Sequence, residues 1–244
     1  MSFMLSPRKI IIALLDLARD WRSKAMFEAL RKYGGRRVLD LGGGDFYSRI
    51  GAWYPKPQVW VNLDWSPLLS TGRDSSSYFP VVGEVNTPPF RSESFDSILC
   101  IQVLEHIYRP DLVVKEAYRL LQPGGILILL TPQTSNLHLA PNHFYNFTRF
   151  WHARCLAEAG FRVIEYRPLG GAWSSIASRQ LLSLLQMFRF KGMTCDDLKR
   201  SWLFYILSPL MIAYSLITIP ICLLFGLADL SEEPNNHLYI AEKL

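Results

Sequence analysis

Short apolar runs alternate with helical patterns along most of the chain, and this alternation indicates a sheet that is covered by helices. Runs with the length and composition of buried strands lie near residues 37–41, 58–63, 79–82, 96–101, 125–131 and 161–166. Helical periodicity lies near residues 46–53, 111–121 and 148–159. Because strands that alternate with helices build parallel sheets, the pattern predicts an α/β fold with a doubly wound sheet.

The pattern also predicts an element at each end of the chain. Residues 8–33 alternate apolar and charged positions with helical period, which predicts an amphipathic helix that Gly34-Gly35 ends. Residues 237–243 alternate polar and apolar positions, as an edge strand does. We therefore divide the chain into an N-terminal helix (1–35), an α/β core (36–167), a helical, hydrophobic insertion (168–235) and a last strand that completes the sheet (236–244).

The insertion holds an uncharged run of 26 residues, from Leu203 to Ala228. About 20 apolar residues suffice to cross a bilayer as a helix. Pro209 and Pro220 interrupt the run, however, and proline tends to kink or break a helix, so we expect two short arms that are each too short to span. A single crossing would also separate residues 237–243 from the sheet. A re-entrant or interfacial hairpin fits both facts, with a hydrophobic cap and a single span as alternatives.

Charge and cysteine content narrow the class of protein. The formal net charge is +5 over 244 residues without a dense Lys/Arg run, so a nucleic-acid partner is not indicated. The basic N-terminal residues follow helical spacing, as on a solvated helix face or a face that meets an anionic membrane. The four cysteines lie far apart without a C-x-x-C, which favours neither a disulfide framework nor a metal site. No signal-peptide pattern opens the chain, so we expect a cytoplasmic location.

The stretch Val38–Phe46, V-L-D-L-G-G-G-D-F, carries the strongest functional signal. An apolar strand that ends in an acid and breaks into glycines is typical of a nucleotide-binding turn, since Gly42 and Gly44 let the backbone lie close to a ligand. Twenty-odd residues later a second apolar strand ends in Asp64, a position from which an acid reaches ribose hydroxyls. Gly83-Glu84-Val85 reads as a further strand end that carries a carboxylate.

Four motifs follow one another in order over residues 36 to 165. They are D-x-G-x-G (40–44), D-x-S-P (64–67), S-F-D…L-E-H (94–106) and L-x-P-G-G (121–125). With this set the chain resembles the class I S-adenosylmethionine-dependent methyltransferases, and most of all the broad subgroup that includes the quinone-biosynthesis type. The resemblance implies a seven-stranded Rossmann-like sheet in which the last strand inserts antiparallel between the fifth and the sixth.

The resemblance also implies a role for each cofactor-binding candidate. Asp40 would orient the glycine loop or meet the methionine amino group, and Gly42 and Gly44 would make room for the methionine moiety and the ribose. Asp64 would accept both ribose hydroxyls, because a carboxylate accepts two hydrogen bonds at once. Adenine recognition would fall to Glu84 and Val85, and Gln102 would close over the cofactor. The chain departs from the family pattern at Phe46, which stands in place of a third glycine.

Histidines supply the candidates for a general base. Methyl transfer to an acceptor that carries a proton at neutral pH needs a base, whereas alignment alone supplies much of the rate for other acceptors. His106, His138 and His143 follow the fourth and fifth strands, near the expected mouth of the site. We take His143, in a polar and aromatic loop, as the first candidate and His106 as the second. No grouping along the sequence has metal-ligand spacing, so no metal is expected.

Three functions compete at this point. The first is an S-adenosylmethionine-dependent methyltransferase that acts on a small acceptor, lipid-linked or glycan-type, with peripheral membrane contact through residues 203–228. The second is a catalytically silent S-adenosylmethionine-binding protein that docks to a membrane or partner, an alternative that Phe46 keeps open. The third, a nicotinamide oxidoreductase, suits the distance from Gly44 to Asp64 but not the later motifs. The segment N-T-P-P-F (86–90) carries an inserted Thr87 and precedes the fourth strand, so it does not indicate amino methylation of a base.

Overall fold

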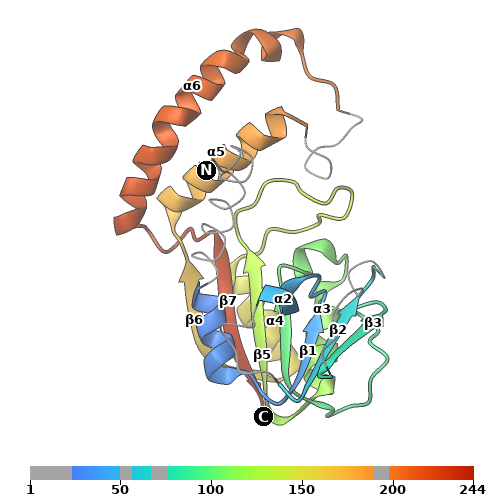
Figure 1. Cartoon of the computed structure of the whole chain (residues 1–244). Coiled ribbons are helices and arrows are strands. Elements are labelled where there is room, and N and C mark those ends of the chain that lie inside the picture. Colours follow the sequence, from blue (N-terminus) through green and yellow to red (C-terminus); the bar gives the residue numbers. More distant parts are fainter. Residues whose placement is uncertain (1–23, 50–56, 67–75, 190–197) are drawn as a thin grey trace, which may run out of the picture.

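Seven strands form one mixed sheet in the order β3-β2-β1-β4-β5-β7-β6 (Figure 1). The computed structural model describes residues 24–49, 57–66, 76–189 and 198–244. The strands are β1 (Arg37–Leu41), β2 (Val59–Asp64), β3 (Tyr78–Val82), β4 (Phe95–Ile101), β5 (Leu121–Pro132), β6 (Phe161–Leu169) and β7 (Asn236–Lys243). The neighbours from β3 to β5 are parallel, and β7 runs antiparallel between β5 and β6. The predicted fold class is confirmed, including the placement of the last strand.

Helices precede, connect and follow these strands. They are a helix over residues 24–33, α2 (Phe46–Arg49), η2 (Leu104–His106), α3 (Pro110–Leu120), α4 (Arg149–Ala159), α5 (Ala172–Met187), α6 (Trp202–Phe225) and η3 (Gly226–Ala228). The first helix ends at Gly34-Gly35, as the sequence predicts. The predicted helix begins at residue 8, and its residues 8–23 lie outside the described part of the chain. Thr148 caps α4 through a hydrogen bond from the Trp151 backbone N–H, and Gly160 ends α4 in the left-handed region.

Side chains that alternate along the strands divide between two cores, one on each face of the sheet. Leu39 and Ile98 point into a core that α3 and α4 cover. Val38 and Leu99, their chain neighbours, point into a second core that the helix over residues 24–33 and α2 cover. Successive strand residues face opposite sides, so a sheet that is buried on both faces needs nearly continuous apolar runs. The sheet therefore lies between two helical layers.

The insertion forms a helical hairpin, α5 and α6, beyond the carboxyl end of β5 (Figure 1). The expectation of two short arms is wrong, because α6 continues through both Pro209 and Pro220 over 24 residues. Pro209 cannot donate to the Tyr205 carbonyl, and the Ser208 hydroxyl donates to that oxygen instead at 3.0 Å. A neighbouring serine hydroxyl of this kind lets a helix tolerate proline.

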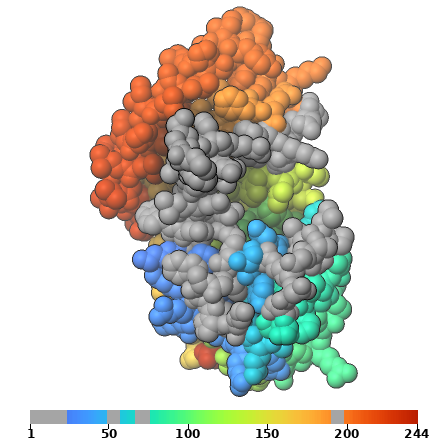
Figure 2. Space-filling view, viewed as in Figure 1, coloured from blue at the N-terminus to red at the C-terminus, as the bar shows by residue number. Residues whose placement is uncertain are grey.

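Helix α6 exposes most of its apolar surface to solvent. In the described part of the chain, residues 202–228 are long and apolar enough to cross a membrane, and only 11% of their most apolar window is buried. At 1.5 Å per residue α6 is about 36 Å long. Figure 2 shows it along one outer edge of the molecule. Because β7 pairs with β5 and β6 after α6, the topological objection to a single crossing still holds.

Asp229 ties the end of the insertion to its beginning. Its carboxylate accepts hydrogen bonds from the backbone N–H groups of Trp173, at 2.8 Å, and Ser174, at 3.0 Å. It thereby satisfies two free donors in the first turn of α5, as an N-cap side chain does. At the other end of the hairpin, the Arg200 guanidinium donates to the carbonyls of Gln186 and Met187 at the end of α5. The hairpin is therefore held at both ends.

We expect Asp229→Ala to lower the free energy of unfolding by about 0.5–2 kcal/mol, because it removes the acceptor at the start of α5. Burial acts to raise the pKa of Asp229, but the hydrogen bonds from Ser174, Trp173 and Leu230 outweigh it and lower the pKa. The contribution should thus be present above about pH 4, where the unfolded carboxyl ionises, and be lost as pH falls through the lowered folded-state pKa. Urea unfolding at pH 7 and pH 3 measures both effects. The control is Glu232→Ala, an exposed acid nearby, and equal midpoints for the two variants would contradict the capping role.

Candidate active site

A glycine turn connects β1 to α2 at the carboxyl edge of the sheet. Gly42 and Gly44 have φ angles of 64° and 51°, a region that other residues rarely adopt. A Cβ at Gly43 would lie 2.1 Å from Asp40 Oδ2, so that position excludes a side chain for steric reasons. The turn therefore brings bare backbone against the end of β1, as the sequence predicts for Gly42 and Gly44.

Two polar side chains of β2 hold this turn in place. Asp64 accepts a hydrogen bond from the Gly44 backbone N–H at 3.1 Å and another from the Ser66 N–H at 3.0 Å. The Asn62 amide donates to the Gly44 carbonyl at 3.1 Å and to the Tyr78 hydroxyl at 2.9 Å. Asp64 thus uses one oxygen to position the turn. The sequence analysis does not predict Asn62 as a site residue. The feature that could have revealed it is a polar residue in an otherwise apolar strand, two positions before Asp64.

Asp40 is a buried acid at the end of β1, only 1% exposed. Its Oδ2 has no hydrogen-bond partner among the described residues. Burial raises the pKa of Asp40 well above its usual range, the Trp60 indole opposes this, and the charge of Asp64 adds to it. A cationic group beside Asp40 would relieve the cost of a buried carboxylate. The pair of Asp40 and the bare glycine turn therefore fits an ammonium group of a ligand that also carries a ribose near Asp64.

Phe46 packs into the core next to the turn. Its ring stacks on Phe27 with the centroids 5.9 Å apart, and lies 6.3 Å from the Trp60 ring. The side chain is 9% exposed and opens α2. Its bulk is therefore accommodated mainly between the sheet and the first helix, although Phe46 also contributes to the wall of the cavity described below.

The other three predicted residues differ in their placement. Gln102 follows β4 with a φ of 57°, and its amide donates to Asn236 Oδ1 at 2.8 Å. Glu84 is exposed, whereas Val85 is buried in the core against α3 and α4. Both lie in a turn after β3, so the expectation that residues 83–85 end a strand is wrong; β3 already ends at Val82. The Gly83 N–H still donates to the Asp64 carbonyl at 3.0 Å, and the turn then closes with a hydrogen bond from the Thr87 N–H to the Glu84 carbonyl at 3.2 Å.

A cavity of about 540 Å³ opens beside the glycine turn. Asp40, Gly43 and Gln102 form part of its wall at the carboxyl ends of β1 and β4. On the opposite side Ser178 and Leu182 of α5 close it. Further lining residues come from the end of β5 and the loop after it, and from the start of β7: Pro132, Thr134, Ser135, Asn136, Leu137, His138, Asn235 and Asn236. The cavity thus connects the glycine turn with the insertion.

Three histidine rings meet where β4 and β5 end. His106 lies on η2 after β4, and His138 and His143 lie on the loop after β5. The ring centroid of His138 is 4.8 Å from that of His106 and 4.4 Å from that of His143. His106 and His143, the predicted base candidates, are 5.7 Å apart by the same measure. The fold therefore brings together all three histidines that the sequence places near the site mouth.

The surroundings of His106 and His143 lower the pKa of both rings and favour their neutral form. Burial is the main cause that lowers the pKa of His106, with repulsion from the charged forms of His138 and His143 in the same direction and the hydrogen bond to Asn142 against it. Burial, followed by repulsion from His138, also lowers the pKa of His143. The His143 Nε2 lies 3.4 Å from the Ser135 hydroxyl. A neutral imidazole at a cavity mouth can accept a proton.

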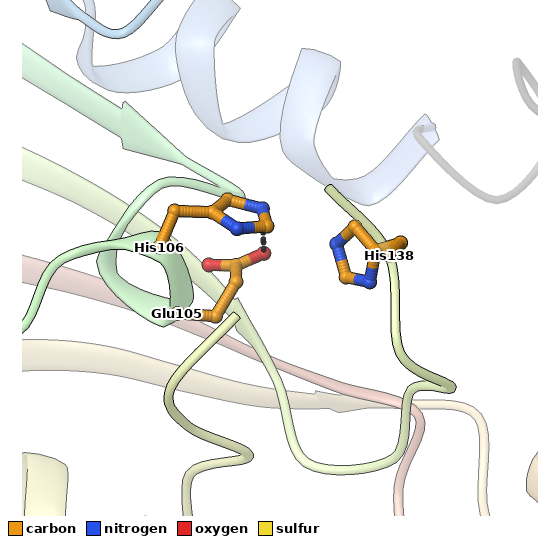
Figure 3. Close-up of side chains that lie close together, drawn as sticks. All are labelled: Glu105, His106 and His138. Carbon is orange, nitrogen blue, oxygen red and sulfur yellow. Dashed lines mark ion pairs between the residues drawn. The ribbon is translucent and has the colours of Figure 1, made fainter. Parts of the chain in front are cut away.

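Glu105, next to His106, is a further buried acid. It is 0% exposed, and neither carboxylate oxygen has a hydrogen-bond partner among the described residues. Burial raises its pKa to about 8. Its Oε1 lies 3.9 Å from His106 Nε2, as Figure 3 shows. The sequence placed Glu105 within a family motif and gave it no role of its own.

Comparison with known proteins places this site in a family. Residues 39–129 match a family model described as a methyltransferase domain. A tRNA U34 carboxymethyltransferase of Sulfurimonas denitrificans is 32% identical over 122 residues, which cover 46% of this chain and 41% of the relative. A ubiquinone/menaquinone biosynthesis C-methyltransferase of Haemophilus ducreyi is 32% identical over 127 residues, 48% of each chain. The chain spans less than half the length of these curated relatives.

Solved structures extend the likeness to the fold of nearly the whole chain. A chain of the Haloferax volcanii complex that contains the Trm112 methyltransferase activator has a TM-score of 0.60 at 15% identity, over 93% of this chain and 90% of that one. An S-adenosylmethionine-dependent methyltransferase of Mesorhizobium loti has a TM-score of 0.54 at 14% identity, over 91% and 97%. Residues 39–129 thus carry a methyltransferase domain, and the sheet order gives the chain the fold of S-adenosylmethionine-dependent methyltransferases.

Proposed function

We propose that the chain is an S-adenosylmethionine-dependent methyltransferase that acts on a small acceptor, lipid-linked or glycan-type, at the cytoplasmic face of a membrane. The observation that carries the proposal is the cavity that runs from Asp40 and Gly43 to Ser178 and Leu182 on α5. One end has the chemistry expected of a cofactor site, and the other end belongs to the hairpin whose second helix exposes an apolar surface. A cofactor and an acceptor that enters along the hairpin would meet in this cavity.

The residues around the turn suit S-adenosylmethionine. Asp40 would hold the methionine ammonium, and the glycine backbone would lie along the methionine moiety. The Asp64 oxygens would accept the ribose hydroxyls while the carboxylate keeps its contact with Gly44. Glu84 and Val85 follow β3, as the family's adenine-binding segment does, with Val85 offering an apolar contact. The sulfonium of the cofactor supplies an electrophilic methyl group, so the protein's main task is alignment.

His143 is our first candidate for the base that removes the acceptor's proton. Its lowered pKa leaves the imidazole neutral and able to accept a proton. Its neighbour His138 lines the cavity. His106 is the second candidate, but its Nδ1 is engaged by the Asn142 carbonyl at 2.6 Å. We therefore assign the proton transfer to His143 and keep His106, which lies beside it, as the second candidate for the base.

Helix α6 supports the membrane part of the proposal. Soluble monomers rarely expose a contiguous apolar surface of this size. Arg189, Lys199 and Arg200 lie near the connection between α5 and α6, where they would meet anionic headgroups. The return of β7 to the sheet favours a helix that lies in the interface over one that spans the bilayer. A lipid-linked acceptor would then reach the cavity along α5. A nucleic-acid acceptor is disfavoured because no dense basic run borders the described site.

Mass spectrometry of ligands that co-purify with the full chain, followed by turnover assays with the acceptor they identify, tests the proposed function. Formation of S-adenosylhomocysteine in step with a methylated acceptor supports an enzyme. Tight binding of S-adenosylmethionine with no turnover on any co-purified acceptor would favour the silent binding protein instead.

Asp64→Ala should weaken S-adenosylmethionine binding by about 1–3 kcal/mol, since it leaves ribose hydroxyls without their charged acceptor. Calorimetry on the purified chain measures the change. Asp64→Asn keeps one side-chain oxygen and should lose less, and a thermal melt of both variants controls for loosening of the turn at Gly44. An unchanged affinity in Asp64→Ala would place the nucleoside elsewhere.

His143→Gln should lower the turnover number by about 10²–10⁴-fold while the affinity for S-adenosylmethionine stays as it is, because a base acts on the acceptor only. Steady-state kinetics and cofactor titration on the same preparation separate the two effects. The matched variant His106→Gln should lose less. Wild-type turnover in His143→Gln would remove it from the mechanism.

The double variant Ile206→Lys with Leu210→Lys should reduce liposome binding at least about tenfold, because it places two charges on an exposed apolar face of α6. Co-sedimentation with vesicles that contain anionic lipid, without detergent, measures the bound fraction. Phe150→Lys replaces an equally exposed apolar residue on α4 and should bind like the unchanged protein. If the unchanged protein stays in the supernatant, a hydrophobic-cap role for α6 replaces the membrane role.

A further inference from the structure

Glu105, His106 and His138 each bring a ligand atom to within 4.8 Å of the others. Glu105 and His106 are neighbours on η2, and His138 faces them from the loop after β5 (Figure 3). The Glu105 carbonyl accepts hydrogen bonds from the backbone N–H groups of Phe144 and Tyr145, which ties this loop to η2. The cluster therefore exists only in the folded chain, and the spacing of its members along the sequence does not reveal it.

The Glu105 carboxylate needs a positive partner. It is fully buried, and both of its oxygens lack hydrogen-bond donors among the described residues. A buried carboxylate without a partner is costly and is compensated by a proton, a cationic side chain or a metal ion. Its Oε1 lies 3.9 Å from the His106 imidazole, too far for a hydrogen bond. The two groups are therefore not hydrogen-bonded to each other, and the carboxylate oxygens are free to bind an ion.

Hydrogen bonds fix both histidines with their Nε2 lone pairs available. The His106 Nδ1 lies 2.6 Å from the Asn142 carbonyl, and the His138 Nδ1 lies 2.9 Å from the Asn136 carbonyl. A carbonyl only accepts, so each Nδ1 carries the proton and donates. In a neutral ring the other nitrogen, Nε2, then has a free lone pair. Histidines that bind metals are oriented in the same way, by donation of the second ring nitrogen to a carbonyl or carboxylate.

We propose that Glu105, His106 and His138 form a binding site for one divalent first-row transition-metal ion, with Zn²⁺ as the reference ion. Two imidazoles and one carboxylate are a donor set that such ions prefer, whereas Mg²⁺ and Ca²⁺ favour oxygen ligands throughout. Ligand atoms at about 2.0–2.2 Å from one ion lie about 3–3.5 Å apart, so the three side chains must close by about 1 Å when the ion binds.

The site has an open side toward the cavity. His138 belongs to the same cavity wall as Asp40 and Gly43, and three protein ligands leave at least one coordination position for water or another oxygen ligand. The His143 ring lies beside one of the proposed ligands, with its centroid 4.4 Å from that of His138. Metal binding itself does not depend on the function proposed above, and it can be measured without an acceptor.

Titration of the chelator-treated, untagged full chain with Co²⁺ alone tests the site. We expect one equivalent to bind, with the visible absorption of a low-coordinate Co²⁺ ion, and Zn²⁺ to displace it. Glu105→Gln keeps the shape of the side chain but not its charge, and His138→Gln removes one nitrogen ligand. Each should weaken the affinity for Co²⁺ at least about 100-fold. Glu158→Gln, on the exposed face of α4, should bind Co²⁺ like the unchanged chain.

Circular dichroism melts show whether each variant folds. Glu105 is fully buried, so Glu105→Gln is the variant at risk; His138 lies on a half-buried loop, and His138→Gln then provides the test. Stoichiometric binding that both variants retain, or no binding by the unchanged chain, would overturn the proposal and leave Glu105 as a buried protonated acid. Calorimetry with S-adenosylmethionine on the chelator-treated chain tests the cofactor site separately, so the two proposals can fail independently.

Discussion

The return of the last strand to the sheet is the constraint on which the rest of this structure depends. β7 follows α6 in the sequence, and it forms hydrogen bonds with β5 on one side and with β6 on the other. The uncharged, 24-residue helix α6 lies between β6 and β7 in the sequence, so it must begin and end on the same side of any membrane as the sheet. The hairpin of α5 and α6 satisfies this requirement, because Asp229 brings the end of α6 back to the start of α5. The interfacial position proposed for α6 is compatible with both ladders, whereas a single crossing of the bilayer is not.

The same return completes the cavity. Asn236 begins β7 and accepts a hydrogen bond from Gln102, which follows β4 with a positive φ. Asn136, in the loop after β5, donates to Ser183 and Gln186 on α5 at 3.0 and 2.9 Å. The insertion is thus linked by buried and half-buried polar contacts to the strand ends that carry the cofactor chemistry. Polar contacts of this kind are directional, and they hold α5 against the cavity, while α6 is linked to α5 by the hydrogen bond from Thr218 to Gln180.

Much of the fold could be predicted from the sequence because its signals are local. Strand runs, the Gly34-Gly35 stop, the Thr148 cap and the glycine turn each depend on a few neighbouring residues. The antiparallel last strand followed from the family resemblance. The wrong predictions also have physical causes. The Ser208 hydroxyl donates to the carbonyl that Pro209 leaves without a donor, so α6 continues as one helix. Residues 83–85 form a turn because β3 already ends at Val82. Asn62 and the cluster of Glu105, His106 and His138 depend on contacts between distant segments. No periodicity reports such contacts, and the donor set of the cluster therefore became visible only with the fold.

Two buried carboxylates in the described part of the chain have oxygens without a hydrogen-bond partner: Asp40, which lines the cavity, and Glu105, which lies beside the histidine cluster. Asp40 lies near the end of β1 and Glu105 follows the adjacent strand β4, and burial is the chief cause that raises the pKa of both. A protein rarely leaves a buried acid unpaired, since its ionised form is costly in a medium of low dielectric constant. Each acid is therefore either protonated or matched by a cation that comes with a ligand. The two proposals above assign these acids different cations: an organic ammonium group at Asp40, beside the bare glycine backbone, and a metal ion at Glu105, beside two oriented imidazoles. Asp40 and His138 line the same cavity, so an acceptor that enters along α5 would lie near both proposed sites.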